Sequence, residues 1–352
     1  MREFNKSNLD LTMREVRVEE AIRKVAEAAK TSAMDSSKKV DFMVLAKMMS
    51  DSDIGRVRLE SDDLNIQERV GITEVSDTPK VGIIRRFRDP STGEMNEAME
   101  NMTPEQVVDY AVSRIDKEKF GDAKRDYYYD EVRKEIIGQI AKTRLTDNDK
   151  VHLEAIASLV STSIFSRVFF DHAVGSSLST IGITKVQNPD TGKEEHRLAI
   201  FKKQKDAETG KVTETAEEKS LEDILLYSLT RIPKETMQKG RELALRERAR
   251  IRIEEDIDKS GLPEEERIKL KAIEYIVLSS RLNRVNLKQT HPRVEERLSI
   301  KYDENPRLGI LRRQRDPETG AGEEGFIEMS LVELSKYVDD RIPESSRDQI
   351  RQ

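Results

Sequence analysis

The chain of 352 residues contains no cysteine and no tryptophan, and aromatic residues make up only 5% of it. The absence of cysteine excludes disulfides and cysteine-ligated zinc or iron–sulfur centres. No apolar run approaches the ~18 residues of a membrane-spanning helix, and the N-terminal residues lack the apolar stretch of a secretory signal. We therefore expect a protein of the cytoplasm, or of a virion if the source is viral, that has no membrane contact and no cofactor.

An excess of positive charge is also missing. The sequence has 62 Lys and Arg residues against 68 Asp and Glu, which gives a net charge of -6 at pH 7. The chain as a whole therefore has no attraction to nucleic acid or to anionic membranes. Charged residues make up 37% of the chain, well above the ~25% that is usual for globular domains, so each domain is expected to have a modest core and a large solvated surface.

What the sequence does contain is one segment in three copies. It occupies residues 81–93, 198–210 and 308–320, with offsets of 117 and 110 residues. The same offsets relate three tyrosines, each of which is followed four residues later by an arginine. These pairs are Tyr110 and Arg114, Tyr227 and Arg231, and Tyr337 and Arg341. Such an ungapped match predicts three tandem homologous domains, over 1–118, 119–236 and 237–352.

The apolar periodicity predicts an α+β fold for each domain: two helices, a small antiparallel sheet (a three-stranded meander plus one strand) and a closing helix. In the first domain we expect a helix capped by Thr12, a second over 40–49, and strands over 56–60, 71–75, 80–88 and 94–101. A capping box at Thr103 begins the closing helix. The polar segments 117–126 and 233–239 are predicted to be linkers, too short to act as flexible tethers.

A turn follows each repeated strand. Its pattern is Asp-x-x-Thr-Gly, in which the glycine can adopt the positive φ that a following bulge needs. We expect this conformation at Gly93, Gly210 and Gly320.

The repeated tyrosine and arginine have two interpretations. Their i,i+4 spacing places both on one face of the closing helix, so they could form a functional site in every repeat. Alternatively, the tyrosine packs on the sheet and the arginine binds a carbonyl or a carboxylate of its own domain. We favour this structural role, because small cores need buried aromatic anchors.

The repeated strand is basic in all three copies. Alternation along the first copy places Ile84, Arg86 and Arg88 on one face and Arg85 on the other. The candidate binding residues are Arg85, Arg86, Arg88, Lys202, Lys203, Lys205, Arg312, Arg313 and Arg315. They could bind a phosphate backbone, or they could protect the sheet from edge-to-edge aggregation and pair with nearby acids.

Catalytic chemistry has little support in the sequence. None of the histidines, His152, His172, His196 and His291, recurs at an equivalent position. Asp171 and His172 are adjacent but lack a third partner. No nucleotide-binding, zinc-protease, hydrolase or calcium-loop pattern is present. We therefore predict no catalytic residue and no metal ligand.

These observations lead us to expect a non-enzymatic structural or adaptor protein. Its three domains would bind a protein partner or take part in a homo- or hetero-oligomeric assembly, such as a viral or phage structural component. The alternative is a nucleic-acid-binding protein that uses the basic strands. A metal-dependent enzyme is the third and least supported possibility.

Overall fold

The computed structural model describes residues 4–52, 54–63, 65–163, 167–170, 177–188, 192–206, 208–303, 305–316, 318–319 and 321–343. The chain divides into two compact units. One unit comprises residues up to 127 and from 250 onwards, and the other comprises residues 128–249. The sheets of the first and third repeats therefore lie in the first unit, and the sheet of the middle repeat lies in the second.

The fold class is confirmed as mixed α+β. The described residues form three antiparallel sheets of four strands each. In every sheet the strands lie in the order of the sequence, so the strand predicted to stand beside a three-stranded meander extends that meander by one strand.

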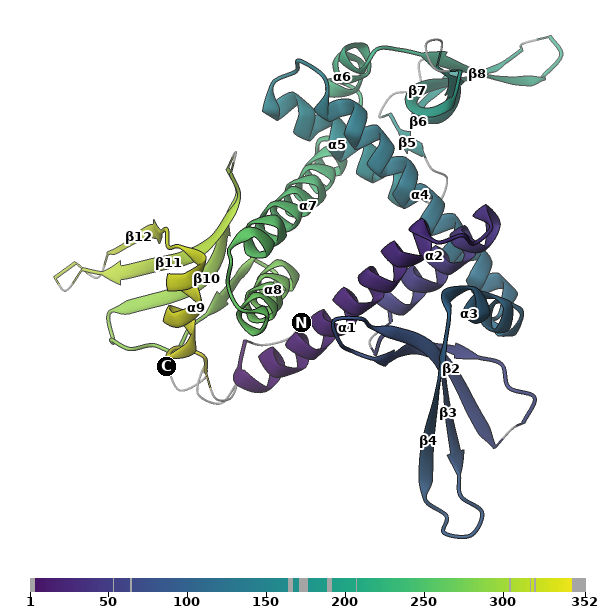
Figure 1. The fold of residues 1–352 in the computed structure, drawn as a ribbon. Coiled ribbons are helices and arrows are strands. Elements are labelled where there is room, and N and C mark those ends of the chain that lie inside the picture. The colour runs from purple at the N-terminus through teal and green to yellow at the C-terminus, as the bar shows by residue number, and fades with distance from the viewer. Residues whose placement is uncertain are drawn as a thin grey trace. The chain divides into compact units, whose positions relative to one another are not determined.

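The first repeat has two long helices, one sheet and a closing helix followed by a short 3-10 turn (Figure 1). Its elements are α1 (Lys6–Thr31), α2 (Ser36–Ser50), β1 (Arg56–Leu59), β2 (Ile66–Glu74), β3 (Lys80–Arg88), β4 (Met95–Met102), α3 (Pro104–Ala111) and η1 (Val112–Arg114).

The predicted start of α1 at Thr12 is wrong. The helix begins at Lys6, because the Asn5 side chain accepts a hydrogen bond from the Asn8 amide and so caps the helix earlier. Thr12 lies inside the helix, where its hydroxyl donates to the Asn8 carbonyl. The capping box at Thr103 is confirmed: Thr103 and Gln106 each accept from the other's backbone amide.

One face of the first sheet packs on the helices. Val57, Val70 and Ile83 alternate towards them and belong to the same buried cluster as Ile22 of α1 and Phe42 of α2. The opposite face carries the side chains of the alternate residues.

From its second helix on, the third repeat follows the same order of elements. These are α8 (Glu264–Ser279), β9 (Arg284–Asn286), β10 (Val294–Lys301), β11 (Arg307–Arg315), β12 (Gly322–Ile327) and α9 (Leu331–Asp339). Ser330 and Glu333 form a capping box that begins α9. Ile273 of α8, Leu298 of β10 and Ile310 of β11 are buried, and α8 packs against β10.

The first and third repeats contact each other through α1 and α8 (Figure 1). The contact includes buried charge: the ammonium of Lys271, on α8, lies 2.6 Å from Glu20 of α1 and 2.7 Å from Asp258. Lys271 is only 6% exposed, so these two carboxylates compensate the cost of removing its charge from water.

The middle repeat forms the second unit. Its elements are α5 (Asp147–Thr162), β5 (Arg167–Phe169), β6 (Ser177–Gln187), β7 (Glu194–Lys205), β8 (Val212–Glu218) and α6 (Leu221–Leu229), together with parts of two further helices. Its core joins Ile136, Ile156, Ile181 and Ile224.

The two predicted linkers are helical. Residues 117–126 form the beginning of α4 (Lys117–Ala141), and residues 234–239 form the beginning of α7 (Lys234–Lys259). Neither segment contains a proline after its first helical position, and pairs such as Arg250 and Glu254, 2.9 Å apart at i,i+4, support the helix. The high charge of these two segments is therefore that of solvent-exposed helices and not of linkers. The domain limits 1–118, 119–236 and 237–352 stay a prediction.

Candidate interaction site

The tyrosine and arginine of the first repeat belong to a hydrogen-bonded cluster on the helix-facing side of the sheet. The Tyr110 hydroxyl donates to the Glu68 carboxylate, with both oxygens 2.9 Å away. The Arg114 guanidinium lies over the Tyr110 ring, 4.1 Å from its centre, and donates to the Tyr110 carbonyl. Arg85 donates to the same Glu68 at 2.6 Å. These hydrogen bonds join β2, β3 and α3.

The third repeat contains the same cluster. Tyr337 donates to Glu296 at 2.7 Å, Arg312 donates to it at 2.8 Å, and Arg341 lies 3.8 Å from the centre of the Tyr337 ring. Burial, and then the hydrogen bond to Glu296, raises the pKa of Tyr337. Arg341 also lies 3.5 Å from Glu296. Glu296 is 7% exposed, so a buried carboxylate is held by a phenol and two guanidinium groups.

The middle repeat lacks the buried glutamate. Ser179 lies opposite Lys202, where Glu68 lies opposite Arg85 in the first sheet. Lys202 instead pairs with Glu217 of the edge strand at 2.6 Å. The Tyr227 ring keeps its arginine, Arg231, at 3.9 Å.

Sequence reasoning did not identify Glu68 and Glu296 as members of these clusters. A signal was available, because the two glutamates occupy equivalent positions on the second strand. Each lies three residues before the residue that pairs with the repeated glycine, Gly82 or Gly309, and each pairs with a repeated arginine, Arg85 or Arg312.

The turns after the basic strands have the expected geometry where they are described. Gly93 has φ +73° and Gly210 has φ +67°, whereas Gly320 lies outside the described residues. In the first turn Asp89 accepts hydrogen bonds from Ser91 and Thr92, which lower its pKa.

The nine basic residues fall into two groups. Arg85, Lys202 and Arg312 lie on the helix-facing side in the clusters described above. The other six lie on the opposite side, which we call the open face, and three of them pair with carboxylates. These three pairs are Arg86 with Glu97 at 3.7 Å, Lys203 with Glu214 at 3.7 Å, and Arg315 with Glu295 at 2.7 Å.

The remaining three basic residues are Arg88, Lys205 and Arg313. None of them forms an ion pair with any residue that the structure describes. Of the nine basic residues of the repeated strands, one in each repeat thus lacks a carboxylate partner among the described residues.

An arginine of the first strand also crosses the open face in every repeat. Arg56 reaches Glu97 at 3.3 Å, Arg284 reaches Glu324 at 3.5 Å, and Arg167 contacts Glu214. The stem of Arg56 passes over Gly71, where an added Cβ would lie 2.9 Å from it. This ion pair joins the first strand, at one edge of each sheet, to the fourth strand at the opposite edge.

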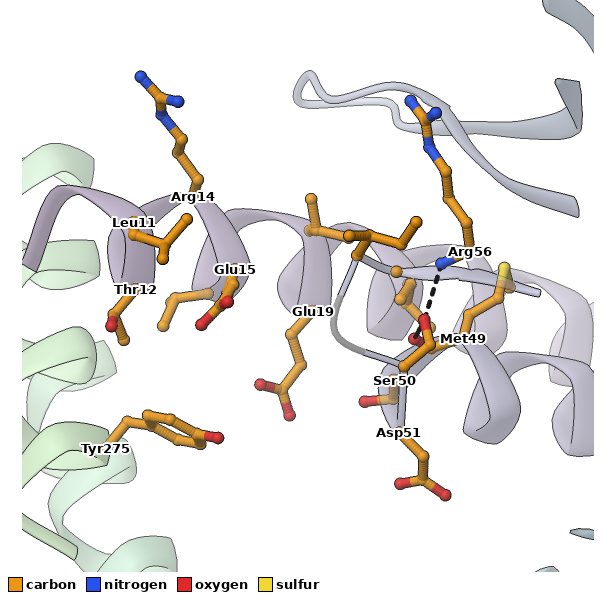
Figure 2. A pocket seen from close by; sticks show the side chains of 16 residues that line it. Leu11, Thr12, Arg14, Glu15, Glu19, Met49, Ser50, Asp51, Arg56 and Tyr275 are labelled. Carbon is orange, nitrogen blue, oxygen red and sulfur yellow. Dashed lines mark hydrogen bonds between the residues drawn. The ribbon is translucent and has the colours of Figure 1, made fainter. Parts of the chain in front are cut away.

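A groove of about 830 Å³ lies in the first unit, between α1 and the loop that joins α2 to β1 (Figure 2). Leu11 and Val18 supply apolar surface, and Tyr275 borders the groove from α8. The side chains of Arg14 and Arg56 extend away from the side on which Glu19 and Tyr275 lie (Figure 2). The groove therefore mixes apolar and charged groups without a set of side chains in hydrogen-bond reach that would serve as nucleophile and base.

A buried carboxylate belongs to the residue that precedes Tyr275 of the groove lining. Glu274 of α8 is 2% exposed, and burial, followed by the charge of Glu254, raises its pKa to about 8. Partial removal from water, followed by the charge of Glu254, likewise raises the pKa of Glu19 of α1. In the described part of the chain, no three or more His, Asp or Glu side chains are arranged to hold a metal ion.

One histidine of the second unit connects α4 to the sheet. His196 lies 2.7 Å from the Tyr128 hydroxyl through Nε2 and 2.7 Å from Glu135 through Nδ1. Its backbone amide donates to Glu135, and its carbonyl accepts from Gln139. These four bonds fix the helix on β7. Asp171 and His172 lie outside the described residues.

Comparisons of the chain with protein-family models, with curated proteins and with solved structures found no match. In the part of the chain that the structure describes, no helix combines the length and the apolar character needed to cross a membrane.

Proposed function

We propose that this protein is a non-enzymatic structural or adaptor component whose three homologous domains bind protein partners or a larger assembly. One observation carries the proposal. Tyr110 and Tyr337, which the repeats share, lie in clusters that join helix to sheet in the first and third repeats, whereas the open faces differ apart from the arginine that crosses each of them. Surfaces that vary on a common scaffold are suited to contacts with different partners.

The test is purification of the tagged full-length chain from the cells in which it occurs. We expect a stoichiometric complex that contains other protein chains or several copies of this chain, measured by native mass spectrometry. The ultraviolet absorbance spectrum of the complex should be that of protein without bound nucleic acid. A chain that remains a lone monomer under native conditions contradicts the proposal, and stoichiometric metal accompanied by turnover would favour the metal-dependent enzyme.

A nucleic-acid-binding protein is the second candidate, and the uncompensated Arg88, Lys205 and Arg313 favour it. If these residues bind phosphates, their combined replacement by Gln should flatten the dependence of log affinity on log salt by roughly 0.7–0.9 per lost contact. The matched control replaces Arg86, Lys203 and Arg315, which already pair with carboxylates. We expect weak binding that neither set changes. A submicromolar, salt-sensitive complex with DNA or RNA that only the first set abolishes would establish the second candidate instead.

A further inference from the structure

The open face of the first sheet gathers five arginines. Residues directly opposite each other in an antiparallel sheet share a face, and the register places Arg58 opposite Arg69, and Arg88 opposite Met95. The same alternation along β1 and β3 brings Arg56 and Arg86 to this face. Five long cationic side chains therefore extend from three adjacent strands on one side of the sheet.

Little negative charge balances them. Among the described residues, Glu97 is the one carboxylate that pairs with any of the five, and it contacts Arg56 and Arg86. Arg58, Arg69 and Arg88 form no ion pair with any described residue. Like charges directly opposite each other destabilise a sheet, so the Arg58–Arg69 pair is a cost that an anionic partner would remove.

The third sheet shows how the same face is neutralised within one repeat. Glu295 lies opposite Arg313 there, at the position that Gln67 holds opposite Arg86 in the first sheet. Glu295 pairs with Arg297 at 3.4 Å and with Arg315 at 2.7 Å.

Two further differences between the sheets add to the charge of the first. The position of Arg58 is occupied by Asn286 in the third sheet, opposite Arg297, and by Phe169 in the second sheet, opposite Thr180. Of the three open faces, only the first thus has both an additional arginine, Arg58, and an uncharged residue, Gln67, at the position of the neutralising Glu295 of the third.

The apolar residues on this face indicate the kind of partner. Met95 is 52% exposed and Met99 is 50% exposed, and both lie on the arginine side of the sheet, opposite Arg88 and Ile84. The one lysine in the four strands, Lys80, pairs with Glu74 at 2.6 Å. Arginine and methionine are enriched at protein–protein interfaces, whereas lysine is depleted. Surfaces that bind single-stranded nucleic acid usually add aromatic rings for base stacking.

We propose that the open face of the first sheet, formed by Arg56, Arg58, Arg69, Arg86, Arg88, Met95 and Met99, binds an acidic protein segment that also carries apolar side chains. The proposal rests on the proposed function, since it names the chemistry of one partner of the scaffold. Guanidinium groups would bind carboxylates of the partner in bidentate pairs, and the two methionines would contact its apolar side chains.

The test is a binding titration of the full-length chain with a fluorescent peptide in which Asp and Glu alternate with Leu. Gln67→Glu introduces the neutralising acid of the third repeat, and we expect it to weaken binding about tenfold, because the new carboxylate competes for the arginines. Gln67→Asn is the matched control, and it should leave the affinity unchanged.

The reciprocal change provides a gain of function. Glu295→Gln releases Arg297 and Arg315 in the third sheet, so it should increase the number of peptides bound per chain. If Gln67→Glu unfolds the first unit, the double variant Arg58→Asn and Arg69→Thr is tested instead. Its new residues are those that other repeats have at the same positions, and it should weaken peptide binding at least as much.

Three results would overturn the proposal: no binding of the acidic peptide, an affinity that Gln67→Glu and the double variant leave unchanged, or tighter binding of an oligothymidine or a DNA duplex that shows the same loss. The last result would assign the face to nucleic acid. If the wild-type chain purifies in a stoichiometric protein complex but does not bind the acidic peptide, only this assignment fails. If the wild-type chain forms no protein complex, the proposed function fails.

Discussion

The Tyr337 hydroxyl donates a 2.7 Å hydrogen bond to the carboxylate of Glu296, a residue 41 positions earlier that is 7% exposed. This bond joins the closing helix to the second strand of the same repeat. Tyr110 and Glu68 repeat the relationship in the first sheet. In the middle repeat the structure gives the Tyr227 hydroxyl no hydrogen-bond partner among the described residues.

Replacing Tyr337 by Phe should therefore destabilise the first unit by about 1–3 kcal/mol, since the buried Glu296 loses a donor. Urea-induced unfolding measures the change. Tyr227→Phe is the matched control and should cost less than about 0.5 kcal/mol, because its hydroxyl has no such acceptor to leave unpaired. Equal losses in the two variants would show that the phenol–carboxylate bond does not stabilise the repeat.

Glu274 should make the stability of the first unit depend on pH. Its folded-state pKa is raised from 4.5 to about 8, so between these values the folded state holds a proton that the unfolded state releases. The carboxyl therefore favours folding below pH 4.5, and this contribution falls as the pH rises towards 8, by at most about 1.4 kcal/mol per pH unit. The facing groups Glu19, Arg250, Glu254 and Lys271 modulate this effect.

Glu274→Gln should flatten this dependence and raise stability near pH 8, because the amide stays neutral. The measurement is the urea midpoint of the variant and of the wild-type chain across this range of pH. Glu94→Gln, a change at an exposed residue of the first turn, serves as the control and should keep the wild-type slope. A Glu274→Gln chain with an unchanged slope would place the titration elsewhere.

Local patterns in the sequence were sufficient for the fold class and for the faces of the basic strand. Alternation correctly separates Arg85 from Arg86, because a strand has a fixed period of two. Capping residues at Thr103 and Ser330 mark the starts of the closing helices, since their hydrogen bonds reach only three residues.

Contacts between distant residues could not be predicted in this way. The pairing of Lys271 with Glu20 joins residues 251 positions apart and brings the first repeat against the third, a contact between repeats that are not adjacent in the sequence. The buried Glu68 was overlooked for a related reason: a single glutamate in a chain this rich in charge gives no sign that a tyrosine 42 residues later will cover it.

The turn glycine should tolerate only residues that adopt a positive φ. Gly93 has φ +73°, and an added Cβ would have no neighbour within 4 Å, so the cost of substitution comes from the backbone alone. Gly93→Val should lose about 1–2 kcal/mol of unfolding free energy, whereas Gly93→Asn should lose less, because Asn enters this region more readily. Thermal unfolding compares the two. If valine and asparagine are equally well tolerated, the turn has another conformation in solution.

A buried ion pair in the second unit allows a stricter test, because it separates the cost of an unpaired charge from the value of the pair. Arg248 donates to Glu154 at 2.5 and 2.9 Å, and Glu154 is 6% exposed. Arg248→Met leaves that carboxylate buried without its cation, and we expect a loss of about 3–5 kcal/mol.

Adding Glu154→Leu removes the stranded charge, so the double variant should regain most of that stability, since apolar replacements of a buried pair are often neutral or stabilising. The double-mutant cycle, measured by urea unfolding, compares both single variants with the pair. Asp147, which Arg248 contacts from the exposed end at 2.7 Å, provides the control: Asp147→Asn should change stability by less than about 1 kcal/mol. If the double variant is as unstable as Arg248→Met, the arginine stabilises the unit through the packing of its stem rather than through its charge.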